Sequence, residues 1–176
     1  GIRDIMVVTG TEHAGAVFQL LGSGAAYGCS LTYRVQDQAG GIAQAMSLAR
    51  EFIGEAPFCC ILGDNIFGAE LRQYVVGFTD FLKSIKTWQP AGMVLLKEVS
   101  DPERYGVALV EKGPENGSLR GFVEKPSPSP SNLAVTGIYF YQGEGVFDII
   151  AGLRPSARGE LEVTDVNNTY IKDKQL

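Results

Sequence analysis

Apolar residues occur along the chain in short runs that alternate with stretches of helical spacing. The run at residues 58–62 has no polar alternation and ends at Gly63 and Asp64. Such a run, with β-branched and aromatic residues, is typical of a strand that is buried on both faces of a parallel sheet. The sequence therefore predicts a strand here, and the carboxyl end of such a strand is where an open α/β sheet binds its ligands.

Similar patterns predict elements over most of the chain. We expect strands at residues 2–9, 31–35, 58–62, 92–96 and 132–141, and helices at residues 14–21, 42–53, 71–85 and 146–153. The alternation of strands and helices specifies an α/β fold with a mostly parallel sheet and helices on its faces. Residues 107–111 and 119–123 flank a turn rich in Gly, Pro and Asn at 112–117, which predicts an antiparallel hairpin. Thr164 is expected to cap a last helix.

Composition and charge exclude several classes of partner. The 176 residues are 45% apolar with a formal net charge of −5, which fits one globular domain and lacks the basic stripe of a nucleic-acid-binding protein. No apolar stretch reaches the roughly 18 residues of a membrane span, and no signal peptide is recognisable. We expect a cytoplasmic protein whose cysteines, Cys29, Cys59 and Cys60, are core thiols.

Two polar turns that follow predicted strands carry candidate chemistry. Asp64 is a hard oxygen ligand suited to Mg²⁺ beside phosphates, or it caps the helix that follows. Gln36 precedes the glycine pair Gly40 and Gly41. The backbone N–H groups of the two glycines can face a base or a phosphate, and the Gln36 amide suits a pyrimidine edge. A simple connecting turn is the alternative for this glycine pair.

A third candidate is the charged pair Glu124 and Lys125 at the end of the predicted hairpin. If the strand continues, the two side chains point to opposite sides and need not pair with each other. The carboxylate can then accept hydrogen bonds from sugar hydroxyls while the ammonium meets a phosphate. A solvated strand end is the alternative interpretation.

Several stretches together resemble the sugar-1-phosphate nucleotidylyltransferases, most closely those that act on glucose 1-phosphate and dTTP. The matching stretches are residues 1–5, 41–45, 62–66, 101–107, 124–126, 134–141 and 158–167. They follow the family order, so the joint match is more specific than any single motif. The resemblance implies a Rossmann-like sheet of the nucleotide-diphospho-sugar transferase type, with the antiparallel hairpin forming the sugar pocket.

The resemblance also implies a reaction and a set of site residues. Such enzymes make dTDP-glucose and pyrophosphate for activated-sugar biosynthesis, without a covalent intermediate, by positioning and by charge neutralisation with Mg²⁺ and cations. Other nucleotidylyltransferases share most of these stretches, so uracil is an alternative base. The implied roles are metal binding by Asp64, thymine contacts by Gln36 and Gly41, glucose contacts by Tyr105, Gly106, Glu124 and the Val135 backbone, and sugar-phosphate contacts by Lys125 and Arg158. Asp64, Lys125 and Arg158 are the expected catalytic residues.

The family pattern has two parts that the 176 residues lack. These are a Gly-x-Gly-Thr-Arg triphosphate loop before the first strand and a later Trp-x-Asp-Thr-Gly segment with a second metal carboxylate. We therefore expect one domain over residues 1–176 that lacks both parts and is inactive alone. The alternative is a non-catalytic short relative that binds sugar phosphate or nucleotide. A homo-oligomer is expected, assembled through the open edge of the first strand.

Overall fold

The computed structural model describes residues 2–69, 71–84, 92–111, 118–173 and 176. Its strands are β1 (Asp4–Gly10), β2 (Ser30–Gln36), β3 (Phe58–Ile61), β4 (Gly92–Glu98), β5 (Gly106–Glu111), β6 (Ser118–Glu124) and β7 (Leu133–Tyr141). Its helices are α1 (Ala14–Leu21), α2 (Ile42–Ser47), α3 (Arg50–Ile53), α4 (Leu71–Ser84), α5 (Gly143–Gly152) and α6 (Val163–Lys172), with 3-10 turns η1 (Ala25–Tyr27) and η2 (Pro102–Arg104). The predicted α/β class is confirmed.

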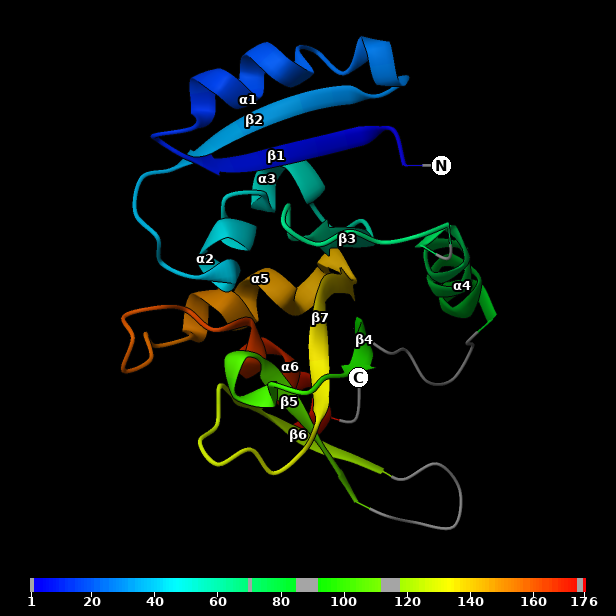
Figure 1. Ribbon diagram of the computed structural model, residues 1–176. Helices are drawn as coiled ribbons and strands as arrows, with labels where there is room; N and C mark the ends of the chain where they lie inside the picture. The colour runs from blue at the N-terminus through cyan, green and yellow to red at the C-terminus, as the bar shows by residue number, and fades with distance from the viewer. Residues whose placement is uncertain (1, 70, 85–91, 112–117, 174–175) are drawn as a thin grey trace.

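The strands form two sheets, a small one above a larger one in Figure 1. β1 and β2 pair in parallel along their whole length. In the larger sheet, β7 pairs antiparallel with β3, β4 and β5, and β5 pairs antiparallel with β6. The hairpin is thus confirmed, although its turn at 112–117 lies outside the described residues. Parallel pairing, by contrast, is limited to β1 and β2 in the described part of the chain, whereas the alternation predicted a mostly parallel sheet.

The position of β7 explains this difference. β3 and β4 pair with the same residues of β7, Phe140 and Tyr141. They must therefore lie on opposite edges of β7 and run in the same direction. The strand–helix alternation indeed gave β3 and β4 a common direction, but a later strand of opposite direction lies between them.

The core lies on both faces of β7. Tyr139 and Tyr141 pack against α2, α5 and α6, and Ile138 and Phe140 pack against Phe78 of α4. Successive side chains of a strand point to opposite faces, so this aromatic run supplies both cores. The predicted helices on both faces of the sheet are confirmed. Ile85, the last expected residue of α4, lies outside the described residues.

β3 is less buried than its sequence predicted. Its first three residues are half-buried, and Ile61 is 45% exposed. Within the described residues β3 pairs with β7 alone, so it has one free edge. The fully buried strand is the carboxyl half of β7, where Ile138 and Tyr141 are both 0% exposed.

Two further expectations differ in detail. The helix predicted for residues 42–53 is divided into α2 and α3, because Leu48 and Ala49 leave the regular helix between them. Thr164 does not cap α6, because the cap position belongs to Glu162 and Thr164 lies in the first turn. Its hydroxyl is used elsewhere, as described below.

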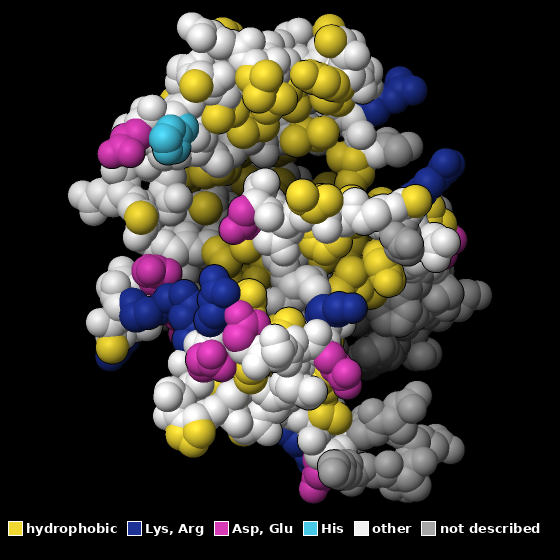
Figure 2. All heavy atoms as spheres, in the orientation of Figure 1, with side chains coloured by type: hydrophobic (Ala, Val, Ile, Leu, Met, Phe, Trp, Pro, Cys, Tyr) yellow, Lys and Arg dark blue, Asp and Glu magenta, His cyan; other side chains and the backbone are white. Residues whose placement is uncertain are grey.

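The last features of the fold are its surface and its three thiols. Among the helices that the structure describes, none combines the length and apolar character needed to cross a membrane. Figure 2 shows hydrophobic side chains gathered on the upper part of the molecule, where Figure 1 places β1 and α1. The three cysteines are free. Burial raises the pKa of Cys60 to about 11, so this thiol is protonated at neutral pH.

Gly143, the first residue of α5, offers a test of this packing. A Cβ atom there would lie 2.5 Å from the Gly54 carbonyl oxygen and 2.7 Å from that of Ala56. Gly143→Ala should therefore lower the free energy of unfolding by about 1–3 kcal/mol, since backbone atoms must shift. Gly152→Ala in the same helix, where nothing lies within 4 Å, should be neutral or stabilising. Urea unfolding followed by circular dichroism compares the two variants, and equal midpoints would contradict this packing.

Candidate functional site

The middle of β7 holds the carboxyl end of β3 in place. The Leu62 N–H donates to the Gly137 carbonyl oxygen at 2.8 Å, and the Gly137 N–H donates to Asn65 Oδ1 at 3.0 Å. A Cβ atom at position 137 would lie 2.5 Å from the Asn65 side chain, so this approach requires glycine. Asn65 Nδ2 also donates to Asp64 Oδ1 at 2.8 Å.

Asp64 therefore lies at the lip of the sheet, as predicted, with an exposed carboxylate. The next helix, α4, begins at Leu71, so Asp64 does not cap it. Within the described residues, no three His, Cys, Asp or Glu side chains gather closely enough to hold a metal ion. Mg²⁺ in phosphate-binding sites commonly takes one or two carboxylates and completes its shell with water and phosphate oxygens. Asp64 fits one ligand of a substrate-bound Mg²⁺.

The predicted sugar-contact residues lie together at one end of the hairpin. Gly106 pairs with Glu124, and the Lys125 N–H donates to the Tyr105 carbonyl oxygen at 3.0 Å. Val107 pairs with Ala134 of β7, which places the Val135 backbone beside this group. A Cβ atom on Gly106 would lie 3.0 Å from Glu124 Oε2, so glycine keeps the space beside the carboxylate open.

Lys125 departs from the strand that the sequence predicted to continue. β6 ends at Glu124, and Lys125 has a φ of 41°, in the left-handed region that non-glycine residues seldom adopt. The side chain of Glu124 is half-buried, while that of Lys125 is exposed. The two charges are thus separated by a backbone turn rather than by the alternation of a strand.

Arg158 brings the sugar end and the phosphate end of the predicted site together. Its Nη2 lies 3.4 Å from Glu124 Oε1. The other oxygen of Glu124 accepts a hydrogen bond of 2.5 Å from the hydroxyl of Thr164. In Figure 2, basic and acidic side chains gather side by side over the loop between α5 and α6. The structure therefore groups Glu124, Lys125 and Arg158 as the sequence predicted.

Glu162 is the main partner of Arg158, and the sequence interpretation missed it. Arg158 Nη2 donates to Glu162 Oε2 at 2.7 Å and to Oε1 at 2.9 Å, and Arg158 Nε donates to Oε1 at 3.2 Å. Ser156 Oγ donates to the same Oε1 at 2.6 Å. Residues 158–162 form the loop before α6, so the i, i+4 rule for charges on a helix surface does not apply to them, and no sequence signal marked this pair.

This pairing keeps both groups charged. Hydrogen bonding to Glu162 raises the pKa of Arg158 above its usual value, against the opposing effect of burial. Burial alone would raise the pKa of Glu162, but hydrogen bonds from Arg158 and Ser156 and the charges of Arg158 and Lys125 outweigh it, so this pKa is lowered. Hydrogen bonds to the charged form favour ionisation in this way.

The predicted base contacts are also neighbours. Gln36 Nε2 donates to the Gly41 carbonyl oxygen at 3.3 Å and to Gln44 Oε1 at 2.6 Å. Gly41 has a φ of 94°, and a Cβ atom on it would lie 2.5 Å from the Leu161 carbonyl oxygen. The glycine turn therefore packs directly on the segment that carries Arg158 and Glu162. This backbone packing is a structural requirement for Gly41 that the sequence did not indicate.

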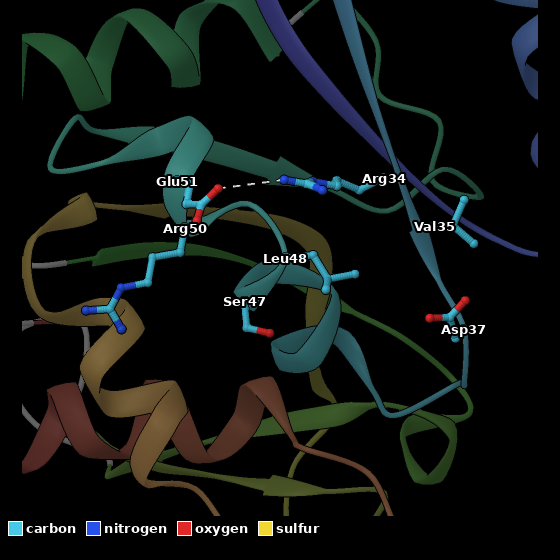
Figure 3. Close-up of a pocket in the computed structure, with 7 residues that line it drawn as sticks. All are labelled: Arg34, Val35, Asp37, Ser47, Leu48, Arg50 and Glu51. Atoms are coloured by element: carbon cyan, nitrogen blue, oxygen red, sulfur yellow. Dashed lines mark ion pairs between the residues drawn. The ribbon is translucent and has the colours of Figure 1, made fainter.

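A separate cavity of about 550 Å³ lies between β2 and the helices α2 and α3 (Figure 3). The residues that line it are Arg34, Val35, Asp37, Ser47, Leu48, Arg50 and Glu51. Arg34 and Glu51 approach to 3.8 Å across it, while Arg50 turns away to an ion pair with Asp148. None of the predicted site residues lines this cavity. The candidate site is the polar group around Glu124 and Arg158.

Comparisons with known proteins agree with this geometry. The family model described as nucleotidyl transferase matches residues 1–176. A glucose-1-phosphate thymidylyltransferase from Xanthomonas campestris pv. campestris is 44% identical over 172 residues, which are 97% of this chain and 55% of that protein. The chain therefore spans little more than half the length of this curated relative.

Solved structures give the same result. A crystal structure assigned to a glucose-1-phosphate thymidylyltransferase from Bacillus anthracis, in complex with sucrose, matches with a TM-score of 0.84 and 49% identity, over 98% of this chain and 65% of that one. A UDP-glucose pyrophosphorylase in complex with UDP-glucose matches with a TM-score of 0.73 and 25% identity, over 99% and 71% of the two chains. The fold is that of the nucleotide-diphospho-sugar transferases.

The pKa of Glu162 predicts an acid-sensitive stability. Because the folded-state pKa lies below the ordinary value of about 4.3, its contribution is present above that value and is lost as the pH falls through the folded pKa. Between about pH 6 and about pH 3.5, the free energy of unfolding should therefore fall more for the wild type than for Glu162→Gln. Glu111→Gln, which removes an exposed partner of Arg120, should follow the wild type, because solvent screens exposed pairs. Urea unfolding at both pH values measures this, and parallel pH dependences of wild type and Glu162→Gln would contradict it.

Proposed function

The chain belongs to the nucleotidyl transferase family, and we propose from this membership that the protein makes dTDP-glucose and pyrophosphate from dTTP and glucose 1-phosphate. The similarity to glucose-1-phosphate thymidylyltransferases over 97% of the chain supports this choice of substrates. The observation that carries the proposal is the contact between Glu124 and Arg158. It sets an acceptor for sugar hydroxyls directly beside a cation for the sugar phosphate.

In this proposal the residues at the end of the hairpin bind the glucose. Glu124 accepts hydrogen bonds from hydroxyl groups, and the backbone of Gly106 and Val135 lines the ring. Tyr105 lies at the exposed edge of this group, where it can cover the sugar. Arg158 and Lys125 neutralise the phosphate, which needs cations because it approaches a second anionic group.

The nucleotide is proposed to bind on the other side of Arg158. Gln36 and Gly41 contact the thymine, and the close approach of Gly41 to Leu161 supports a base site beside the sugar-phosphate residues. A phosphate oxygen of glucose 1-phosphate attacks the α-phosphorus of dTTP. The bond between this phosphorus and the oxygen that bridges it to the β-phosphorus breaks, and pyrophosphate leaves. Mg²⁺, with Asp64 as one ligand, would supply neutralisation of the phosphate charges.

Three further proposals concern the domain organisation, the cellular location and the assembly of the protein. We propose that residues 1–176 act as one nucleotidylyltransferase domain. The free state of all three cysteines suits a reducing compartment and supports a cytoplasmic location. The exposed apolar residues Ile5 and Val35 on the small sheet support association with a further copy of the chain.

The division of the site into a sugar end and a base end gives a first test. In the full-length protein, Arg158→Met should raise the KM for glucose 1-phosphate by about 10- to 100-fold, because a charge-assisted hydrogen bond is lost. Gln36→Ala should instead raise mainly the KM for dTTP. Arg50→Met, which removes an exposed arginine with its own carboxylate partner, is the control and should leave both values unchanged. Pyrophosphate release at varied substrate concentrations measures all of these.

Two outcomes of this assay would refute the proposal. A wild-type protein that releases no pyrophosphate yet binds glucose 1-phosphate in calorimetry would be the non-catalytic relative. If Arg158→Met and Gln36→Ala changed both KM values equally, the assignment of Arg158 to the sugar phosphate and of Gln36 to the thymine would be wrong.

A second test concerns Asp64. Asp64→Asn keeps the side-chain shape and loses the charge, so it should leave the melting temperature nearly unchanged and raise the Mg²⁺ concentration needed for half-maximal turnover. Binding of Mn²⁺ in the presence of dTTP, followed by electron paramagnetic resonance, should weaken as well. Wild-type metal dependence in both measurements would show that Asp64 does not contact the metal.

A further inference from the structure

Glu162 is a buried carboxylate to which the proposed reaction gives no task. It is only 7% exposed, and burial of a charge is costly unless the charge is paired and hydrogen-bonded. Its partners are Arg158, through two nitrogens, and the hydroxyl of Ser156. Glu162 therefore belongs to a fixed arrangement and not to a mobile surface.

The geometry leaves the Nη1 side of Arg158 available, while Nη2 also lies 3.4 Å from Glu124 Oε1 and 3.3 Å from Glu160 Oε2. Glu162 binds Nε and Nη2, which form one edge of the planar guanidinium. Among the described residues, no hydrogen bond is found for Nη1, and the Arg158 side chain is 35% exposed. A guanidinium that is fixed along one edge presents its other N–H groups in a defined direction.

We propose that Glu162 is a positioning residue: it holds one edge of Arg158 so that the opposite edge faces the sugar phosphate, and Ser156 fixes Glu162 in turn. This inference rests on the proposed function of Arg158. The free arginine side chain has many rotamers, and a fixed one loses less freedom when the phosphate binds. Glu162 acts through Arg158 and does not itself touch the substrate.

Lys125 supports this arrangement from a second side. Its positive charge also lowers the pKa of Glu162, so both cations assigned to the phosphate act on the same carboxylate. Two cations that share a site repel each other in the absence of an anion. Glu162 offsets this repulsion and allows both cations to remain in place before the substrate arrives.

The main experiment removes the charge of Glu162 in the full-length protein. Glu162→Gln should raise the KM for glucose 1-phosphate by about tenfold, as expected for a lost hydrogen bond to a charged group. The KM for dTTP should change by less than about twofold, because Arg158 does not bind the base. Asp148→Asn is the matched control. It removes the carboxylate whose Oδ1 lies 2.7 Å from Arg50 Nη2, the same distance as between Glu162 Oε2 and Arg158 Nη2, and it should change neither KM value.

A double-mutant cycle separates positioning from a general structural role. If Glu162 acts through Arg158, adding Glu162→Gln to Arg158→Met should raise the KM for glucose 1-phosphate no further. Additive effects, or equal losses for both substrates, would overturn the inference. If Arg158→Met itself leaves the KM for glucose 1-phosphate unchanged, the proposed function of Arg158 fails instead.

Ser156→Ala provides a milder variant in case Glu162→Gln folds poorly. It removes the hydrogen bond that Ser156 Oγ donates to Glu162 Oε1 and the one that it accepts from the Arg158 N–H at 3.2 Å, and it leaves the ion pair. We expect the KM for glucose 1-phosphate to rise by about three- to tenfold, the usual effect of losing a hydrogen bond, with the melting temperature as a check on the fold. An unchanged KM in a folded Ser156→Ala variant would contradict the role of Ser156, and an unchanged KM in a folded Glu162→Gln variant would overturn the proposal.

Discussion

The pairing of β7 with strands on both of its edges is the constraint on which the rest of the structure depends. β7 hydrogen-bonds to β3 and β5 along one edge and to β4 along the other. Its carboxyl half supplies aromatic side chains to both cores, its amino half carries Val135 beside the sugar-contact residues, and Gly137 in its middle holds Asn65 next to Asp64. Because the same strand builds both cores and lines the site, the packing of Tyr141 and Phe140 also fixes the position of Val135. Gly137 lies between these two parts of β7, where its N–H binds Asn65.

Charge compensation is the second constraint. Arg158 contacts Glu124, Glu160 and Glu162, but the three contacts differ in kind. The contact with Glu162 is short, and its carboxylate is buried. The contacts with Glu124 and Glu160 are longer, and both carboxylates are partly solvated. A buried pair loses much when one partner is removed, whereas a solvated pair contributes little. We therefore assign the orientation of Arg158 to Glu162 and leave Glu124 available to a ligand.

Local features of this fold were predictable from the sequence, and long-range pairings were not. The run at residues 58–62 predicted β3 and the place of Asp64, since a strand and its end are visible in adjacent residues. The hydrogen bond from Gly137 to Asn65 joins residues 72 positions apart, and no local pattern encodes it. The same holds for β7 between β3 and β4. The grouping of the predicted site residues came from family resemblance rather than from periodicity. The Arg158–Glu162 pair lies in a loop, so periodicity did not indicate it either.

The left-handed backbone of Lys125 has a consequence for how sequence can vary at this position. A φ of 41° is adopted most readily by glycine, and by asparagine among other residues. Local stability therefore favours glycine, while the positive charge that acts on Glu162 favours lysine. In a library of variants screened for both properties, position 125 should show opposite preferences for thermal stability and for activity. Such opposed preferences mark positions where function, not folding, selected the residue.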